Sequence, residues 1–143
     1  QARSNLMPGE SITLDDGTII YPEQVLGEAI PGIKYVHIGD AGRTDNLVEV
    51  CRDADALVIE ATYTSIESEM AARFGHLTAT QAAELAVAAN VKNLFLVHIS
   101  RRYSEWEILR EARAIFPNTI VPRDLDHYRI LRDRIERVED AGR

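Results

Sequence analysis

Three short apolar runs in this chain each end at a side chain that can take part in chemistry. The runs and their end residues are 35–38 before Asp40, 57–59 before Glu60, and 94–97 before His98. Short apolar runs separated by longer helical patterns are typical of buried strands in a parallel sheet. Such sheets carry their functional side chains beyond the carboxyl ends of the strands. We therefore expect Asp40 and His98 to meet at one edge of one sheet.

The segments between these runs carry helix signals. A helix is expected over residues 45–52, and three further helices are expected to begin at capping boxes, in which a hydroxyl and a later acidic or amide side chain cover free N–H groups. The capping hydroxyls are those of Thr64, Thr78 and Ser104. Because strands alternate with helices after residue 33, the sequence predicts an α/β fold whose sheet is largely parallel and flanked by helices.

The chain is predicted to be a single domain over residues 1–143. Residues 1–32 are expected to form a β-hairpin, with its turn at 15–17, and a connection rich in proline and glycine. Residues 33–131 form the predicted α/β core. The charged segment 132–143 is interpreted as a solvated helix or a frayed tail.

Composition limits the class of function. The net charge is −7, which argues against a general nucleic-acid clamp, since such a clamp is basic. It does not exclude a nuclease whose metal ions offset local acidity. No apolar run reaches the length of a membrane span. The one cysteine, Cys51, is interpreted as a core thiol and fits a reducing compartment, so we expect a cytoplasmic protein.

Taken one at a time, the polar residues at strand and helix ends have ordinary explanations. Asp40 resembles a turn or N-cap aspartate, and His76 lies in a loop at the mouth of a capped helix. Glu60 is costly to bury without a partner and therefore needs one. His37 is expected to lie on a strand face, and His127 to be structural or to lie at the rim of the site.

Taken together and in order, four motifs resemble those of the ribonuclease Z family. They are Gly39-Asp40, Glu60-Ala-Thr-Tyr63, Gly75-His-Leu-Thr-Ala79 and His98-Ile-Ser-Arg-Arg-Tyr103. That family is the tRNA 3′-end processing branch of the metallo-β-lactamase superfamily, and the resemblance is to its C-terminal half. It implies that the chain folds as the C-terminal half of an αββα sandwich.

The resemblance also implies a role for each matching residue. Asp40 is similar to the carboxylate that bridges two zinc ions, and His98 to the last histidine ligand. His76 is similar to the histidine that gives a proton to the leaving group or contacts the scissile phosphate, and Glu60 to the acidic residue near the end of the RNA. The residues implied to bind substrate are Thr78, Ser100, Arg102 and Tyr103. The implied activity is two-metal hydrolysis of a tRNA precursor by a homodimer.

Two departures from the family pattern bear on these expectations. Ala41 stands where the family usually has threonine, which removes a hydroxyl beside the site. The family's His-x-His-x-Asp-His motif does not occur here, and a catalytic zinc normally has about three protein ligands. We therefore expect the chain to be a fragment whose N-terminal half, or a partner chain, supplies the other ligands.

Two other functions fit the same residues. One is a different hydrolase of the superfamily, acting on a small ester or phosphodiester, which the acidic charge and Ala41 keep open. The other is a half-domain without catalytic activity that serves dimerisation or RNA docking.

Overall fold

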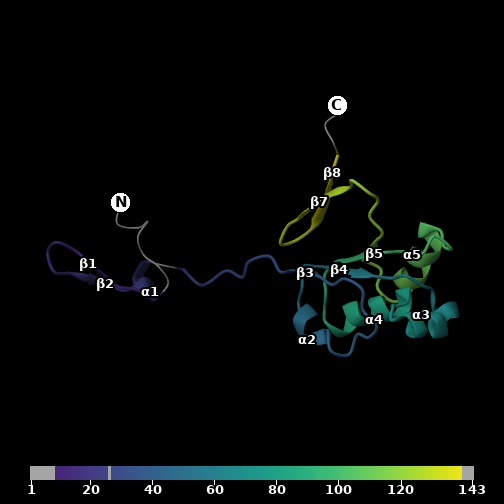
Figure 1. Cartoon of the computed structure of the whole chain (residues 1–143). Coiled ribbons are helices and arrows are strands. Elements are labelled where there is room, and N and C mark those ends of the chain that lie inside the picture. The colour runs from purple at the N-terminus through teal and green to yellow at the C-terminus, as the bar shows by residue number, and fades with distance from the viewer. Residues whose placement is uncertain (1–8, 26, 140–143) are drawn as a thin grey trace. The chain divides into compact units, whose positions relative to one another are not determined.

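The computed structural model describes residues 9–25 and 27–139, which fall into two compact units that divide between Pro31 and Gly32 (Figure 1). The parts of the expected hairpin segment, connection and charged tail at residues 1–8, 26 and 140–143 lie outside the described residues. A single domain over the whole chain stays a prediction.

The first unit contains the expected hairpin. Strands β1 (Ile12–Thr13) and β2 (Ile19–Ile20) pair in antiparallel register. In the turn, the Asp16 carboxylate accepts a hydrogen bond from the Thr18 N–H at 2.9 Å, as aspartates in turns commonly do. The connection that follows contains a single helical turn, α1 (Pro22–Val25), which begins at a proline because proline suits the first helical position.

The second unit is built on a four-stranded parallel sheet in the order β3-β4-β5-β6. The strands are β3 (Tyr35–His37), β4 (Ala56–Glu60), β5 (Leu94–Val97) and β6 (Thr119–Ile120). The strand order follows the chain order without reversal. Since crossovers between parallel strands are right-handed, the helices between them are expected on one face of the sheet.

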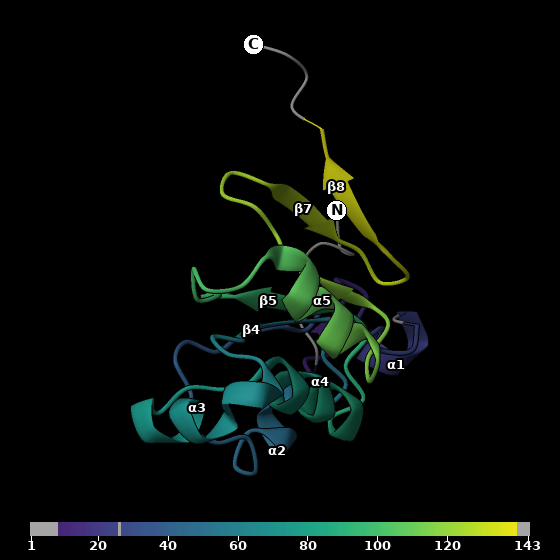
Figure 2. The same ribbon diagram turned by 90° about the vertical axis from the view of Figure 1, so that its right-hand side faces the viewer.

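The helices lie on one face of this sheet (Figures 1 and 2). They are α2 (Val48–Cys51), the 3₁₀ turn η2 (Ser65–Glu67), α3 (Ser68–Phe74), α4 (Ala79–Ala88) and α5 (Glu105–Arg113). Helix α4 contacts β4 and β5 and lies between α2 and α5. None of the helices in the described part of the chain is long and apolar enough to cross a lipid bilayer.

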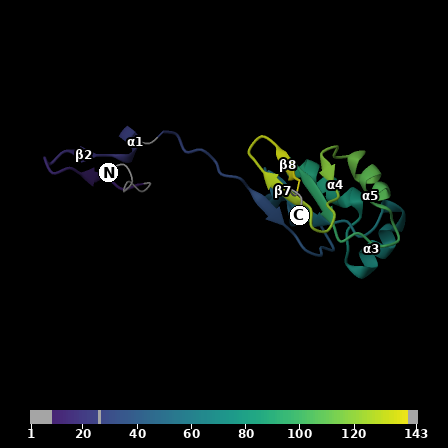
Figure 3. The same ribbon diagram turned by 90° about the horizontal axis from the view of Figure 1, so that it is seen from above.

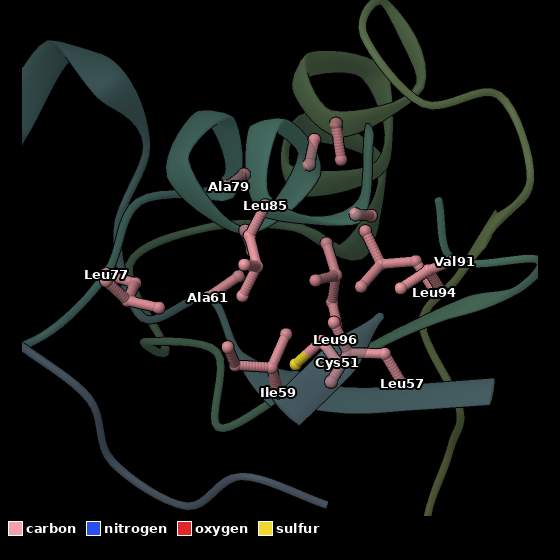
Figure 4. Close-up of a cluster of buried hydrophobic side chains, with 14 of the residues drawn as sticks. Cys51, Leu57, Ile59, Ala61, Leu77, Ala79, Leu85, Val91, Leu94 and Leu96 are labelled. Carbon is pink, nitrogen blue, oxygen red and sulfur yellow. The ribbon is translucent and has the colours of Figure 1, made fainter. Parts of the chain in front are cut away.

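The core lies between the sheet and α4 (Figure 4). Leu57, Ile59, Leu94 and Leu96 supply its sheet side, and alanines of α4 supply much of the helix side. Alanines allow a helix to approach a sheet closely, and interiors packed this tightly tolerate little added volume. Cys51 is buried in this core, and burial raises the pKa of its thiol, which agrees with an unreactive core cysteine.

Two of the three expected capping boxes form. The Thr78 and Ser104 side chains accept from Gln81 N–H and Glu107 N–H, and both reciprocal bonds are present. The expectation at Thr64 is wrong: its side chain makes no capping bond, and the helix there divides into η2 and α3.

The expectation of a solvated helix or frayed tail is wrong for residues 135–138. Strand β8 (Ile135–Val138) pairs antiparallel with β7 (His127–Ile130), and the hairpin lies on the side of the sheet away from the helices (Figures 2 and 3). The charges that suggested a helix form ion pairs across or beside the hairpin, such as Arg129 with Glu136 at 3.8 Å. Cross-strand pairs of opposite charge stabilise a hairpin as i,i+4 pairs stabilise a helix.

A larger side chain on the buried face of α4 should destabilise the fold. Ala83 is fully buried, whereas Ala88 lies on the exposed face of the same helix. We expect Ala83→Leu to lower the free energy of unfolding by about 1–3 kcal/mol because the core has no space for the added atoms. Ala88→Leu is the control and should change it by less than about 0.5 kcal/mol. Urea unfolding measures both, and equal effects would contradict this packing.

Candidate metal centre

The carboxylate of Glu60, at the carboxyl end of β4, connects the loops of the candidate site. Its side chain is 1% exposed. Oε1 accepts a hydrogen bond from the Ala41 N–H at 2.7 Å, and Oε2 accepts one from the Thr62 hydroxyl at 2.5 Å. The Nδ1 atom of His76 lies 3.0 Å from Oε2. The buried charge therefore has the partners that burial demands, and they come from three different segments.

His76 is held where α3 turns into α4. Helix α3 ends at Gly75, whose φ of 71° is the left-handed conformation that glycine adopts readily, and the His76 N–H donates to the Ala71 carbonyl at 2.9 Å. Beyond it, Tyr63 forms a parallel bridge with Thr78, which ties this turn to the end of β4. The position of the His76 imidazole is thus fixed both by backbone contacts and by its side-chain contact with Glu60.

His98 follows β5 and is held through its backbone. Its φ of 56° is uncommon for a residue other than glycine. The Thr62 hydroxyl has one proton, which it shares between Glu60 Oε2 at 2.5 Å and the more distant His98 carbonyl at 3.0 Å. The next turn is held by the Ser100 N–H, which donates to the Thr62 carbonyl at 3.2 Å. The imidazole itself is 55% exposed and is directed toward Asp40. Thr62 therefore positions the backbone of His98 as well as contacting Glu60.

Asp40, His76 and His98 come together at the carboxyl edge of the sheet. One potential ligand atom from each lies within 4.8 Å of the other two. Asp40 Oδ1 is 3.7 Å from His98 Nε2, and the ring centroids of His76 and His98 are 5.4 Å apart. One carboxylate and two imidazoles form a donor set that suits zinc. The side chains present therefore fit a metal ion.

Two glycines set how closely the loops of this cluster approach. A Cβ atom built on Gly42, two residues after Asp40, would lie 3.3 Å from the Gly75 Cα atom, which directly precedes His76. At that separation the backbone of one loop has to move. The contact between these glycines therefore limits the distance between the segments that carry Asp40 and His76.

The residues implied to bind substrate have contacts within the protein. Thr78 is buried and caps α4. Arg102 donates from Nη1 to Glu67 Oε1 at 2.7 Å, and the Tyr103 hydroxyl donates to the other oxygen of Glu67. Ser100 lies close to His98 on the same loop, half-buried. Substrate binding by all four residues stays a prediction.

Sequence reasoning missed two features of this site. The first is the Ala41 N–H, a main-chain donor to Glu60 that any residue except proline supplies, so the missing threonine hydroxyl does not leave Glu60 without a partner on that side. The second is Glu67, which the sequence pattern places in a capping box at Thr64. Its pairing with Arg102 and Tyr103 depends on contacts between segments some 35 residues apart, which local patterns do not reveal.

Comparison with known proteins identifies the class. Residues 8–99, more than half of the chain, match the family model described as the beta-lactamase superfamily domain. The chain belongs to that superfamily. The metallo-beta-lactamase fold protein YhfI of Bacillus subtilis superposes with a TM-score of 0.56 at 21% sequence identity, over 60% of this chain and 35% of that one. This likeness confirms the predicted fold class.

Within the superfamily, the curated relatives are named Ribonuclease Z. The protein of that name from Bradyrhizobium sp. (strain ORS 278) is 51% identical over 124 residues, which are 87% of this chain and 41% of the relative. The one from Archaeoglobus fulgidus is 44% identical over 123 residues, or 85% of this chain and 40% of the relative. The resemblance to ribonuclease Z is thus confirmed. The chain spans about two fifths of the length of the curated relatives it matches.

Removing the charge of Glu60 should destabilise the framework of the site. A glutamine at this position would place an amide NH₂ where one carboxylate oxygen now accepts hydrogen bonds, so we expect Glu60→Gln to lower the free energy of unfolding by about 1–3 kcal/mol. The control is Glu69→Gln, at an exposed glutamate of α3. Urea unfolding of both variants gives the comparison. A loss no greater than that of the control would mean that Glu60 does not hold these loops together.

Proposed function

We propose that this chain is part of a zinc-dependent endoribonuclease of the ribonuclease Z type, which cuts tRNA precursors at their 3′ ends. The observation that carries the proposal is the cluster of Asp40, His76 and His98, whose potential ligand atoms lie within 4.8 Å of one another. The substrate class rests on the relatives named Ribonuclease Z, of which this chain covers about two fifths.

Asp40 and His98 are the side chains that would hold the metal, and the resemblance gives Asp40 the place of the carboxylate shared between two zinc ions. Bound zinc would supply a hydroxide near neutral pH and would offset negative charge on the oxygens of a phosphodiester. The exposed side chains of Asp40 and His98, 63% and 55% accessible, leave room for ligands from outside this chain. We propose that an N-terminal half or a partner chain supplies them.

His76 is the proposed proton donor to the leaving oxygen, and Glu60 is its positioning residue. The Nδ1 atom of His76 faces Glu60, which fixes the orientation of the ring and leaves Nε2 for the reaction. The side chain of His76 is only 20% exposed, so the ring has little freedom to turn. The same cluster geometry would suit His76 as a third metal ligand, and metal content distinguishes the two roles.

The uncovered face of the sheet is the proposed docking surface for the missing half. Tyr35 is 53% exposed and His37 is exposed, and both lie on the side opposite the helix-facing core. The β7–β8 hairpin packs on this side at Phe95, whose ring lies 5.1 Å from that of Tyr128. Large apolar or aromatic side chains left exposed on a sheet face favour association. The missing half would cover this face. Separately, we propose from the resemblance to ribonuclease Z that the complete enzyme is a homodimer, and from the one cysteine of this chain that it is cytoplasmic.

One observation favours a second candidate function. The net charge of −7 suits a small substrate better than RNA, because every phosphate of an RNA adds to the repulsion. The alternative is therefore a hydrolase of the same superfamily that acts on a small ester or phosphodiester. Measuring the turnover of a tRNA precursor and of such small esters side by side distinguishes the two functions. Turnover of the esters alone would favour the alternative.

Loss of either proposed ligand should abolish cleavage. We expect Asp40→Ala and His98→Ala in the full-length protein to lower kcat/KM for a tRNA precursor about a thousandfold or more, because the metal is no longer held. The control is Asp133→Ala, at an exposed aspartate between β7 and β8. Gel assays of precursor cleavage measure the rates. Normal turnover in either ligand variant would refute the proposal.

The two roles open to His76 give different results. As a proton donor, His76→Ala should lower kcat about 10²–10⁴-fold while the protein retains its zinc. As a ligand, the same substitution should also remove zinc. Elemental analysis of the purified full-length variant, alongside its kcat, distinguishes them, and loss of zinc would overturn the assignment of His76 as proton donor.

A further inference from the structure

Two neighbouring arginines beside the candidate metal centre have different surroundings. Arg102 is paired with Glu67 at 2.7 Å and also contacts the sulfur of Met70 at 3.3 Å. Arg101 is exposed and makes no hydrogen bond or ion pair with any residue that the structure describes. The guanidinium of Arg101 is therefore available to a ligand, while that of Arg102 is already engaged.

Arg101 lines a hollow that shares His98 with the candidate metal centre. The hollow has a volume of about 550 Å³, within the range of small-molecule sites. One wall is the loop after β5, with His98, Ser100 and Arg101. The other wall is the segment after β6, with Val121, Pro122 and Asp124. His98 belongs to both the hollow and the cluster, so the hollow adjoins the loop that carries this proposed ligand.

We propose that this hollow binds one nucleotide of the RNA, next to the scissile bond, with its phosphate against Arg101. The inference rests on the proposed function and extends it to a substrate subsite. Arginine is suited to this task because its planar guanidinium forms paired hydrogen bonds with phosphate oxygens. In a chain of net charge −7, an available arginine at the site is the kind of local attraction that an RNA strand requires.

The charges on the two walls orient the nucleotide. Arg123 pairs with Glu105 at 3.2 Å, so their charges offset each other, which leaves Arg101 on one wall and the exposed Asp124 on the other. A phosphate is attracted to Arg101 and repelled by Asp124. Ribose hydroxyls and base amino groups can donate hydrogen bonds to a carboxylate. The phosphate therefore faces the loop after β5, and the sugar or base faces Asp124 and the apolar surface of Val121 and Pro122.

The salt dependence of cleavage tests this subsite in the full-length protein. Each phosphate contact to a single strand contributes about −0.7 to the slope of log affinity against log salt. We expect Arg101→Ala to lower kcat/KM for a tRNA precursor about tenfold at about 50 mM salt, chiefly through KM, and to make the slope shallower by about 0.7. Arg101→Lys keeps the charge and should keep most of the slope.

The matched control is Arg110→Ala, which removes an arginine exposed on α5 and lining a different hollow. It should leave both kcat/KM and the salt slope within experimental error. If the wild-type protein cuts the precursor and Arg101→Ala matches it in rate and slope, the subsite is refuted and the proposed function stands. If the wild-type protein does not cut the precursor, the proposed function fails, and the subsite fails with it.

Discussion

A single buried carboxylate holds the site together. Glu60 stands at the end of the central strand β4 and receives the main chain of Ala41, the hydroxyl of Thr62 and the imidazole of His76. The Thr62 hydroxyl shares its one proton with the His98 carbonyl, and the Thr62 carbonyl accepts from the Ser100 N–H in the same loop. A buried charge without partners is strongly unfavourable, so the folded state requires these loops to close around Glu60. The arrangement of the candidate ligands follows from satisfying that one group.

The sequence predicts the framework because the framework is locally encoded. The apolar runs at 57–59 and 94–97 form neighbouring strands, and the boxes at Thr78 and Ser104 begin helices as expected. The prediction fails for β8, where alternating charges suit a solvated helix and a cross-strand ladder equally well. Local patterns cannot distinguish these structures when the deciding contacts come from another strand.

In the candidate site, too, some features can be predicted from local sequence and others depend on contacts between distant segments. The positions of Asp40 and His98 can be predicted because strand ends in parallel sheets face one edge. The pairing of Arg102 and Tyr103 with Glu67 cannot, since nothing in the spacing of these residues indicates it. The resemblance assigns the substrate to Arg102, and that assignment stays a prediction. The contacts among the described residues pair Arg102 with Glu67 and give Arg101 no partner. Motif similarity therefore identifies a loop, and the packing shows which of its side chains are already paired within the protein.

The contact between Gly42 and Gly75 bears on the size of any ion that the candidate ligands could hold. It is a contact between main chains, so no choice of rotamer can relieve it. A methyl group at Gly42 would push the two loops apart by a few tenths of an ångström. Zinc–nitrogen bonds of about 2.0–2.1 Å and calcium–oxygen bonds of about 2.3–2.6 Å differ by a similar amount. The separation of the segments that carry Asp40 and His76 therefore depends on the absence of a side chain, at a position that supplies no candidate ligand.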